Sequence, residues 1–211
     1  MKKAFLGLLV TCLCWGETGL SANNLQNADL VFVGAENSAF SQAIKSATAK
    51  DGTDYTHIGI VEVAQDGVFV IEATAEKGVV RTAWAEFMRA NEGRAMSLMR
   101  LKKSVKFNAN AIITRAKGFL GQPYDWAFLP NNDKMYCSEL VWEAFVDEKG
   151  TRIFIANPMN FYDKKGNLPE FWVQNFKKLD ISVPQGVLGT NPNDMSKSPQ
   201  IERVENKRVK D

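Results

Sequence analysis

Two side chains of this sequence could together form a nucleophilic thiol site. His57, the only histidine, lies in a segment, 54–61, whose apolar and β-branched residues predict a strand. Cys137 lies at the predicted start of a helix over 137–150. A thiol at a helix N-terminus that faces an imidazole on a sheet is the minimum arrangement for a cysteine nucleophile. The positive end of the helix and a neighbouring imidazolium would both favour negative charge on the Cys137 sulfur.

An acidic partner for His57 follows from the predicted hairpin, with strands 57–63 and 68–74. Side chains alternate between the two faces of a strand. With a connecting loop of four residues, 64–67, Glu72 becomes the diagonal neighbour of His57 on one face, about 7–8 Å away between backbones. Two long side chains can bridge that gap, and Glu72 would then fix the tautomer of the imidazole. A two-residue loop keeps this parity but moves Glu72 further along.

Each of these residues also has a purely structural interpretation. Cys137 could be a buried structural thiol, because free cysteine is among the most buried residue types. His57 could be a satisfied or partly exposed strand residue, and Glu72 could form a salt bridge with one of the lysines. Zinc is an alternative use of a cysteine and a histidine, but a structural site needs four ligands and the chain offers two. We therefore predict no metal, and without a phosphate loop, a dinucleotide fingerprint or a Gly-x-Ser-x-Gly elbow we predict no cofactor.

The first 22 residues are typical of an export signal. Lys2 and Lys3 precede an apolar run over 4–15, which is followed by the small residues Ser21 and Ala22. The run is too short to span a bilayer, and no later segment is long and apolar enough to do so. We predict cleavage near Ala22, a periplasmic or extracellular protein and no membrane-spanning segment after cleavage.

Two further cysteines, Cys12 and Cys14, lie in this predicted leader. A lipoprotein anchor on either is disfavoured, because Thr11 and Leu13 are not the small residues that precede such a cysteine. Cys137 would then be the single cysteine of the mature chain, unable to form an intrachain disulfide. In an oxidising compartment a lone thiol is a liability unless it is buried or used.

The composition beyond the leader predicts one nearly neutral domain. Without residues 1–22 the chain has 24 basic and 23 acidic residues. A nucleic-acid binder would carry a strong basic excess, so we predict no nucleic-acid partner. The length suits one domain over 23–195 with a substantial core. The residues 196–211 are polar without periodicity and predict a loose tail.

The hydrophobic pattern of the chain predicts helices mixed with strands. Besides the hairpin we expect strands at 30–33, 79–81 and 96–99, and helices at 38–49, 84–90, 110–120, 137–150 and 169–176. This mixture predicts an α+β domain in which an antiparallel sheet packs against helices.

Two segments resemble a known family at the predicted nucleophile. The sequence Gly-Gln-Pro-Tyr-Asp-Trp (121–126), followed by Tyr-Cys-Ser-Glu-Leu-Val (136–141), resembles the nucleophile region of NlpC-type cell-wall cysteine peptidases. In those enzymes the cysteine precedes the histidine, whereas here the segments 56–61 and 70–73, with the histidine and the glutamate, come first. That order is similar to the circularly permuted papain-like amidases of the YiiX/YebB type. The resemblance runs over about 29–145.

The resemblance implies a circularly permuted papain-like fold with Cys137 as nucleophile, His57 as base and Glu72 as orienting acid. By the same analogy the Tyr124 hydroxyl lines the oxyanion site. The wider set of candidates for substrate or oxyanion binding is Tyr124, Tyr136 and Ser138.

These features predict an exported cysteine hydrolase that cleaves an amide through a thioester. A peptide or a peptidoglycan stem peptide is the expected substrate, from the compartment and the resemblance. Acyl transfer or lipid hydrolysis, as in lecithin–retinol acyltransferase-like proteins, is an alternative, although their nucleophile segment reads Asn-Cys-Glu-His. A non-catalytic cell-envelope binding module is the other alternative. The sequence predicts neither the oligomeric state nor the role of the residues after 150.

Overall fold

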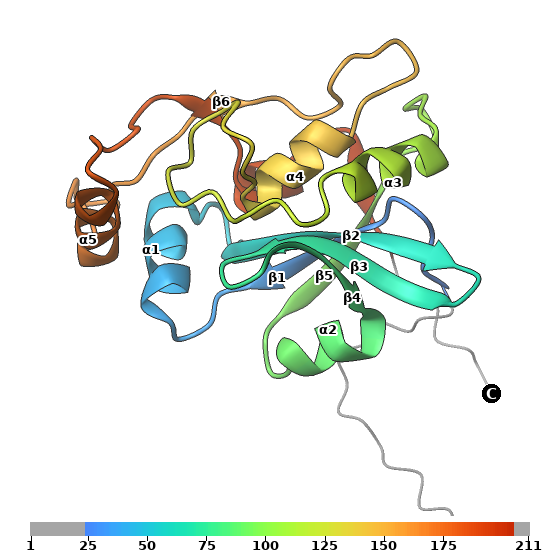
Figure 1. Ribbon diagram of the computed structural model, residues 1–211, viewed down its shortest axis with the longest axis horizontal. Coiled ribbons are helices and arrows are strands. Elements are labelled where there is room, and N and C mark those ends of the chain that lie inside the picture. Colours follow the sequence, from blue (N-terminus) through green and yellow to red (C-terminus); the bar gives the residue numbers. More distant parts are fainter. Residues whose placement is uncertain (1–23, 205–211) are drawn as a thin grey trace, which may run out of the picture.

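A six-stranded antiparallel sheet forms the centre of the structure, a computed structural model that describes residues 24–204 (Figure 1). The order of the strands is β4-β3-β2-β1-β5-β8. Their bounds are β1 Leu30–Gly34, β2 Tyr55–Ala64, β3 Gly67–Thr74, β4 Gly78–Ala83, β5 Met96–Leu101 and β8 Ile201–Arg203. A separate two-stranded ribbon pairs β6, Asn157–Pro158, with β7, Leu188–Gly189. The predicted leader lies outside the described residues.

Helices cover both faces of the sheet. Their bounds are α1 Ala39–Thr48, α2 Trp84–Ala90, α3 Ala109–Gly118, α4 Cys137–Ala144, α5 Glu170–Leu179 and α6 Pro192–Ser196. The helices α3 and α4 pack on one face, and α2 packs on the other (Figure 1). None of the helices described is both long enough and apolar enough to span a bilayer.

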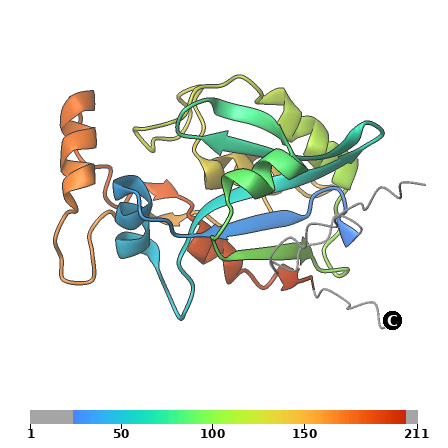
Figure 2. The same ribbon diagram turned by 90° about the horizontal axis from the view of Figure 1, so that it is seen from below.

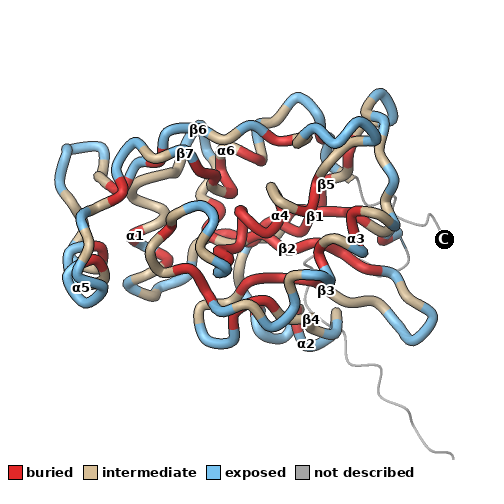
Figure 3. Tube along the Cα trace, turned by 45° about the horizontal axis from the view of Figure 1, so that its top comes forward, coloured by how far each residue is buried: buried red, intermediate tan, exposed pale blue. Residues whose placement is uncertain are grey.

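Alternation along the strands divides the buried side chains between two cores. On β1, Leu30 and Phe32 belong to the large core below α3 and α4, whereas Val31 and Val33 belong to the smaller core with Phe87 of α2. All five residues of β1 are buried, as expected for a strand at the middle of a sheet that is covered on both sides. Figure 3 shows the buried chain concentrated in β1, β2, β3 and α4.

The predicted phase of the hairpin is confirmed. Val63 pairs with Val68, as the parity argument requires, and Ala64 also pairs with Gly67. The connecting turn is therefore 65–66, shorter than the predicted four residues, but the register is the same. The paired residues of β2 and β3 run only to Ile60 and Ile71, and His57 lies beyond the end of this ladder.

The helix α4 ends at Ala144, well before the predicted end near 150. At Phe145 the backbone leaves the helical region. The Asp147 carboxylate then accepts hydrogen bonds from the backbone N–H groups of Lys149 and Thr151, both at 2.8 Å. A side chain that captures its own backbone in this way stabilises a turn in place of a further helical turn.

The predicted loose tail from 196 is wrong for residues 196–204. Residues 201–203 form β8, which pairs with β5 and extends the sheet. Ile201 is 6% exposed and packs into the large core, and Arg203 donates a hydrogen bond of 2.9 Å to the Ser97 hydroxyl. One buried isoleucine between the polar residues Gln200 and Glu202 is too weak a pattern to predict a strand.

The C-terminal third of the chain wraps around the end of the sheet where α1 lies. The helix α5 packs against α1, and Figures 1 and 2 show the two helices together at one end of the molecule. The helix α6 packs against β2. Residues of this segment between Met159 and Pro192 line a pocket together with Cys137, the first residue of α4.

Candidate active site

His57 and Glu72 are joined by a short hydrogen bond between neighbouring strands. His57 Nε2 on β2 lies 2.6 Å from Glu72 Oε2 on β3. The other carboxylate oxygen, Oε1, accepts a hydrogen bond of 2.6 Å from the Thr82 hydroxyl on β4. Glu72 is 5% exposed, and these two hydrogen bonds pair both of its carboxylate oxygens within the protein. Because Glu72 engages Nε2, the Nδ1 side of the imidazole is left for another partner.

Cys137, the first residue of α4, lies beside the same imidazole. Its side chain interacts with the His57 ring, and Cys137 lines the same cleft as His57 and Glu72. Tyr136 precedes the helix in an extended conformation, so the Cys137 N–H is one of the first helical amides and has no acceptor within the helix. The structure thus brings together the three residues that the sequence singled out, from β2, β3 and α4.

The charges of this group reinforce one another. Burial alone lowers the pKa of His57, but the interactions with Cys137 and Glu72 outweigh it and raise the pKa to about 10. Burial raises the pKa of Glu72, yet His57 and Thr82 together hold it below its ordinary value. At neutral pH the arrangement is therefore an imidazolium between a carboxylate and a sulfur.

The two halves of the predicted nucleophile motif are held together by backbone pairing. Asp125 donates its N–H to the Met135 carbonyl at 3.1 Å, and Met135 donates to the Pro123 carbonyl at 3.0 Å. The Asp125 carboxylate, 0% exposed, accepts from the N–H groups of Ala127 and Leu129 at 2.9 and 2.8 Å. These bonds hold the loop 121–126 immediately beside Met135, the residue before Tyr136.

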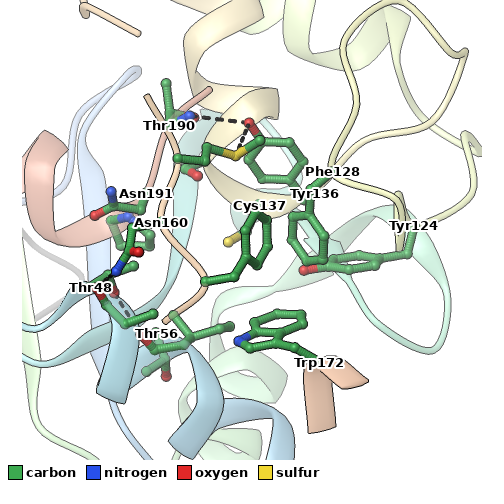
Figure 4. Close-up of a pocket in the computed structure, with 16 residues that line it drawn as sticks. Thr48, Thr56, Tyr124, Phe128, Tyr136, Cys137, Asn160, Trp172, Thr190 and Asn191 are labelled. Atoms are coloured by element: carbon green, nitrogen blue, oxygen red, sulfur yellow. Dashed lines mark hydrogen bonds between the residues drawn. The ribbon is translucent and has the colours of Figure 1, made fainter. Parts of the chain in front are cut away.

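Tyr124 is thereby placed next to Cys137. Burial and the nearby Cys137 sulfur raise the pKa of Tyr124 well above its ordinary value, so its hydroxyl stays protonated. Figure 4 shows this hydroxyl directed to the side of the pocket where the sulfur lies. Tyr124 is thus the predicted oxyanion candidate that lines the same hollows as Cys137, with its hydroxyl directed toward the side of the sulfur.

The other two candidates are placed differently. The Tyr136 hydroxyl accepts a hydrogen bond of 3.2 Å from the Thr190 N–H and lies 3.9 Å from the Met159 sulfur (Figure 4). It therefore anchors the C-terminal segment and is not available to an oxyanion. Ser138 is 1% exposed, and its hydroxyl has no partner within the described chain.

Comparison with known proteins identifies the family to which the chain belongs. A family model described as "permuted papain-like amidase enzyme, YaeF/YiiX, C92 family" matches residues 24–205. The chain belongs to this family. The predicted α+β, permuted papain-like fold is thereby confirmed, and so is the resemblance to amidases of the YiiX type.

Two similar proteins place this C92-family amidase among its relatives. It is 25% identical over 180 residues to the uncharacterized protein YiiX of Escherichia coli K12, and the match covers 85% of each chain. The crystal structure of YiiX from Escherichia coli O157:H7 superposes with a TM-score of 0.67 at 24% identity, over 86% of this chain and 97% of that one. That YiiX is described as a metalloprotein. Within residues 24–204 of the present chain, no group of three or more His, Cys, Asp or Glu side chains is placed to hold a metal ion.

Two hollows of this papain-like amidase meet at Cys137. The first, which we call the polar cleft, is about 350 Å³ and is defined by His57, Glu72, Thr82, Glu86, Arg94 and Cys137. The second, which we call the apolar pocket, is small, about 50 Å³, and is defined by Tyr124, Phe128, Tyr136, Met159, Phe161 and Trp172 (Figure 4). Cys137 lines both, whereas His57 lines only the polar cleft.

The sequence analysis missed Arg94 of the polar cleft. Its guanidinium donates to the Gly34 carbonyl at 2.9 Å, to Asn91 Oδ1 at 2.7 Å and to the Thr56 hydroxyl at 3.2 Å. Burial lowers the pKa of Arg94, against the opposing effect of nearby negative groups that include Glu36. An arginine that follows a turn has no motif to mark it, so only the folded arrangement identifies it.

Proposed function

We propose that this protein is an exported cysteine amidase that acts on a peptide-type substrate with Cys137, His57 and Glu72. Membership of a permuted papain-like amidase family supports a cysteine hydrolase in general. The observation that carries the specific proposal is the 2.6 Å bond from Glu72 to His57 Nε2, with Cys137 in the same cleft and interacting with the same imidazole. This is the acid–base–nucleophile order that thiol catalysis requires.

The proposed reaction forms and breaks bonds at the Cys137 sulfur. The Cys137 sulfur attacks the amide carbon as a thiolate, the form that thiol catalysis requires, and forms a C–S bond while the carbonyl oxygen becomes an oxyanion. In this proposal the donors to that oxygen are the Cys137 N–H, a first amide of α4, and the Tyr124 hydroxyl, which is directed toward the side of the pocket where the sulfur lies. As the C–N bond breaks, the imidazolium of His57 gives its proton to the leaving amine.

Water completes the cycle. His57, now neutral, takes a proton from a water molecule as the water oxygen attacks the thioester carbon. The C–S bond breaks, the acid product leaves, and the sulfur and imidazolium return to their first state. Glu72 keeps the imidazole oriented through both steps and stabilises its charged form.

The predicted export signal and the resemblance to cell-wall peptidases support a cell-envelope peptide, such as a peptidoglycan stem peptide, as substrate. A family of amidases supports a peptide-type bond. The polar cleft also suits a charged leaving amine, because the acids Glu36, Glu76 and Glu86 line it together with Lys77 and Arg94.

The proposal is tested by trapping the thioester. The full chain is incubated with fractionated cell-envelope peptides at neutral pH, quenched in acid and analysed by intact mass and peptide mapping. We expect an acyl adduct on Cys137, and release of amine that falls by about 10³-fold or more in Cys137→Ser and in His57→Ala. Peptide mapping separates Cys137 from Cys12 and Cys14.

Iodoacetamide provides a measure of thiol activation that needs no substrate. We expect Cys137 to be alkylated near pH 6 faster than a free thiol, and His57→Ala to abolish the difference. Equal rates in both proteins, with no adduct from any peptide fraction, would refute the amidase. An adduct from phospholipid vesicles and none from peptides would instead assign lipid acyl chemistry to Cys137.

A further inference from the structure

The first turn of α4 contains a buried carboxyl group, that of Glu139, which the proposed reaction does not use. Glu139 lies two residues after Cys137, at the third position of the helix, and is 5% exposed. A buried acid needs good hydrogen bonds or a nearby cation to stay ionised. The contacts of Glu139 therefore decide whether it carries a negative charge beside the nucleophile.

One peptide unit connects Glu139 to a second buried acid, Asp125. The Tyr136 N–H donates to Glu139 Oε2 at 3.4 Å. The carbonyl of the same peptide unit, that of Met135, accepts from the Asp125 N–H at 3.1 Å. Asp125 is 0% exposed. The two acidic residues thus lie on either side of the peptide that leads into Cys137.

The hydrogen bonds of this pair favour the charged form of Asp125 and the neutral form of Glu139. The Asp125 oxygens accept from the N–H groups of Ala127 and Leu129 at 2.9 and 2.8 Å, whereas Glu139 accepts the single long bond from Tyr136. Among the ion pairs of the described chain, none includes either acid. Two neighbouring buried carboxyls without a cation do not both ionise, and the one with the better hydrogen bonds keeps the charge.

The other charged groups around Glu139 do not reverse this preference. Glu143, one turn further along α4, adds a negative charge, and Arg152 adds a positive one, but Arg152 pairs with Glu143 at 2.8 Å. Burial, Asp125 and Glu143 together raise the pKa of Glu139 to about 8. Glu139 is therefore neutral at pH 7 and acquires its charge in moderately alkaline solution.

A charge on Glu139 would act on the catalytic group. Glu139 influences the pKa of Tyr124 on the loop 121–126 and of Tyr136 before the helix, and the Cys137 sulfur influences both as well. Both tyrosine pKa values are raised, so these hydroxyls stay protonated. A negative charge two residues after Cys137 would oppose formation of the thiolate and of the oxyanion that follows from its attack.

We propose that Glu139 is a positioning residue that must keep its proton: in its neutral form it holds the peptide before Cys137 without adding charge, and its ionisation weakens the site. This inference rests on the proposed function, because it takes Cys137 to be the nucleophile. It adds to that function a first decline of activity in moderately alkaline solution. This decline is partial and separate from the loss of the His57 proton at higher pH.

The first test follows the ionisation of Glu139 itself. In the full chain labelled with ¹³C in the side-chain carboxyl of glutamate, we expect one carboxyl signal to titrate near pH 8. Glu139→Gln should remove this signal, because glutamine keeps an acceptor for the Tyr136 N–H but has no proton to lose. Glu143→Gln is the matched control. It should keep the signal and move its titration to lower pH, because Glu143 helps to raise the pKa of Glu139.

The second test measures the effect on the nucleophile with p-nitrophenyl acetate. The Cys137 sulfur attacks the ester carbon, the C–O bond to p-nitrophenolate breaks, and an acetyl thioester remains, so the rate reports the thiolate and the oxyanion together. Cys137→Ser gives the background, which includes reaction at Cys12 and Cys14. Relative to Glu139→Gln, we expect the wild-type acylation rate to fall about tenfold as the pH rises from about 7 to about 9.

The outcomes separate the two proposals. The role of Glu139 would be overturned, and the amidase would stand, if no glutamate carboxyl titrated above about pH 6.5. A ratio of wild-type to Glu139→Gln rates that is constant with pH would do the same, since it would indicate a merely structural contact. If Glu139→Gln folds poorly, the wild-type titration and its displacement in Glu143→Gln still decide. A Cys137 that reacts with p-nitrophenyl acetate and iodoacetamide no faster than a free thiol would overturn the proposed function and this inference with it.

Discussion

One carboxylate, Glu72, helps to keep the positive charge on the histidine beside it. It bonds to His57 Nε2 and is itself held by the Thr82 hydroxyl. Burial by itself lowers the pKa of His57, and the interactions with Cys137 and Glu72 oppose that effect. Because Cys137 and Glu72 raise that pKa to about 10, the imidazolium persists from neutral pH up to the alkaline range.

Glu72→Gln should therefore move the alkaline limit of activity to lower pH. In the wild-type protein kcat/KM should fall as the pH approaches about 10, where His57 loses its proton. Removing the negative charge lowers the pKa of His57, so the fall should begin at lower pH, and kcat should decrease by about 10²- to 10⁴-fold. Thr82→Val, which removes only the support of Glu72, should shift the limit in the same direction by less. A pH–rate profile that is identical in wild type and Glu72→Gln would contradict this role.

The loop 121–126 is an element positioned by close backbone contact with β4. Gly121 donates its N–H to the Val79 carbonyl, and Val79 donates its own N–H to the Gln122 carbonyl, both at 2.9 Å. Gly78 adopts a φ of +68°, and a Cβ at this position would collide with the Gln122 carbonyl oxygen. The loop that presents Tyr124 to Cys137 therefore depends on a glycine in a neighbouring strand.

Gly78→Ala should displace this loop and reduce activity. Gly150→Ala is the matched control, since Gly150 has a φ of +82° and a Cβ added there would have nothing within 4 Å. Both substitutions should lower the free energy of unfolding by about 1–2 kcal/mol, because alanine is strained at positive φ. Only Gly78→Ala should lose more stability than this and also lose alkylation of Cys137 or turnover. Urea denaturation together with the labelling rate provides the comparison, and equal behaviour of the two variants would show that the contact is unimportant.

Local sequence patterns predicted the strands and helices of the site correctly where the interactions that determine them are close in sequence. The alternation of β2 and β3 was enough to place Glu72 beside His57, because a hairpin register depends on its own turn. The start of α4 at Cys137 was predicted, but its end was not, since the side chain of Asp147 diverts the backbone into a turn. The partner of the Tyr136 hydroxyl, the Thr190 N–H, is 54 residues away and has no motif to announce it.

The C-terminal third of the chain completes the candidate site. The apolar pocket takes Met159, Phe161, Trp172 and Thr190 from this part of the chain, against α1 and α4 from the rest. No periodicity predicts such a wall, because it arises only when segments more than a hundred residues apart pack together. What holds this third in place therefore also determines the shape of the pocket.

Asn193 is the clearest of these attachments. It is 0% exposed, its Oδ1 accepts from the Tyr55 N–H at 2.9 Å, and its Nδ2 donates to the Tyr55 carbonyl and the Thr48 hydroxyl, both at 2.9 Å. One amide side chain thus satisfies the backbone at the start of β2 and ties it to α6. Thr190, Asn191 and Pro192, which line the apolar pocket, directly precede it.

Asn193→Ala should lower the free energy of unfolding by about 1–3 kcal/mol, because it leaves the buried N–H and carbonyl of Tyr55 without partners. The loosened segment should also weaken substrate binding, raising KM more than it lowers kcat, since Cys137, His57 and Glu72 are untouched. Urea denaturation and steady-state kinetics measure the two effects. Gln174→Ala on the exposed face of α5, where the side chain bonds only to Glu170, should change stability by less than about 0.5 kcal/mol. If Asn193→Ala behaved like Gln174→Ala, the C-terminal third would be held by its hydrophobic contacts alone, and the pocket would not depend on this polar attachment.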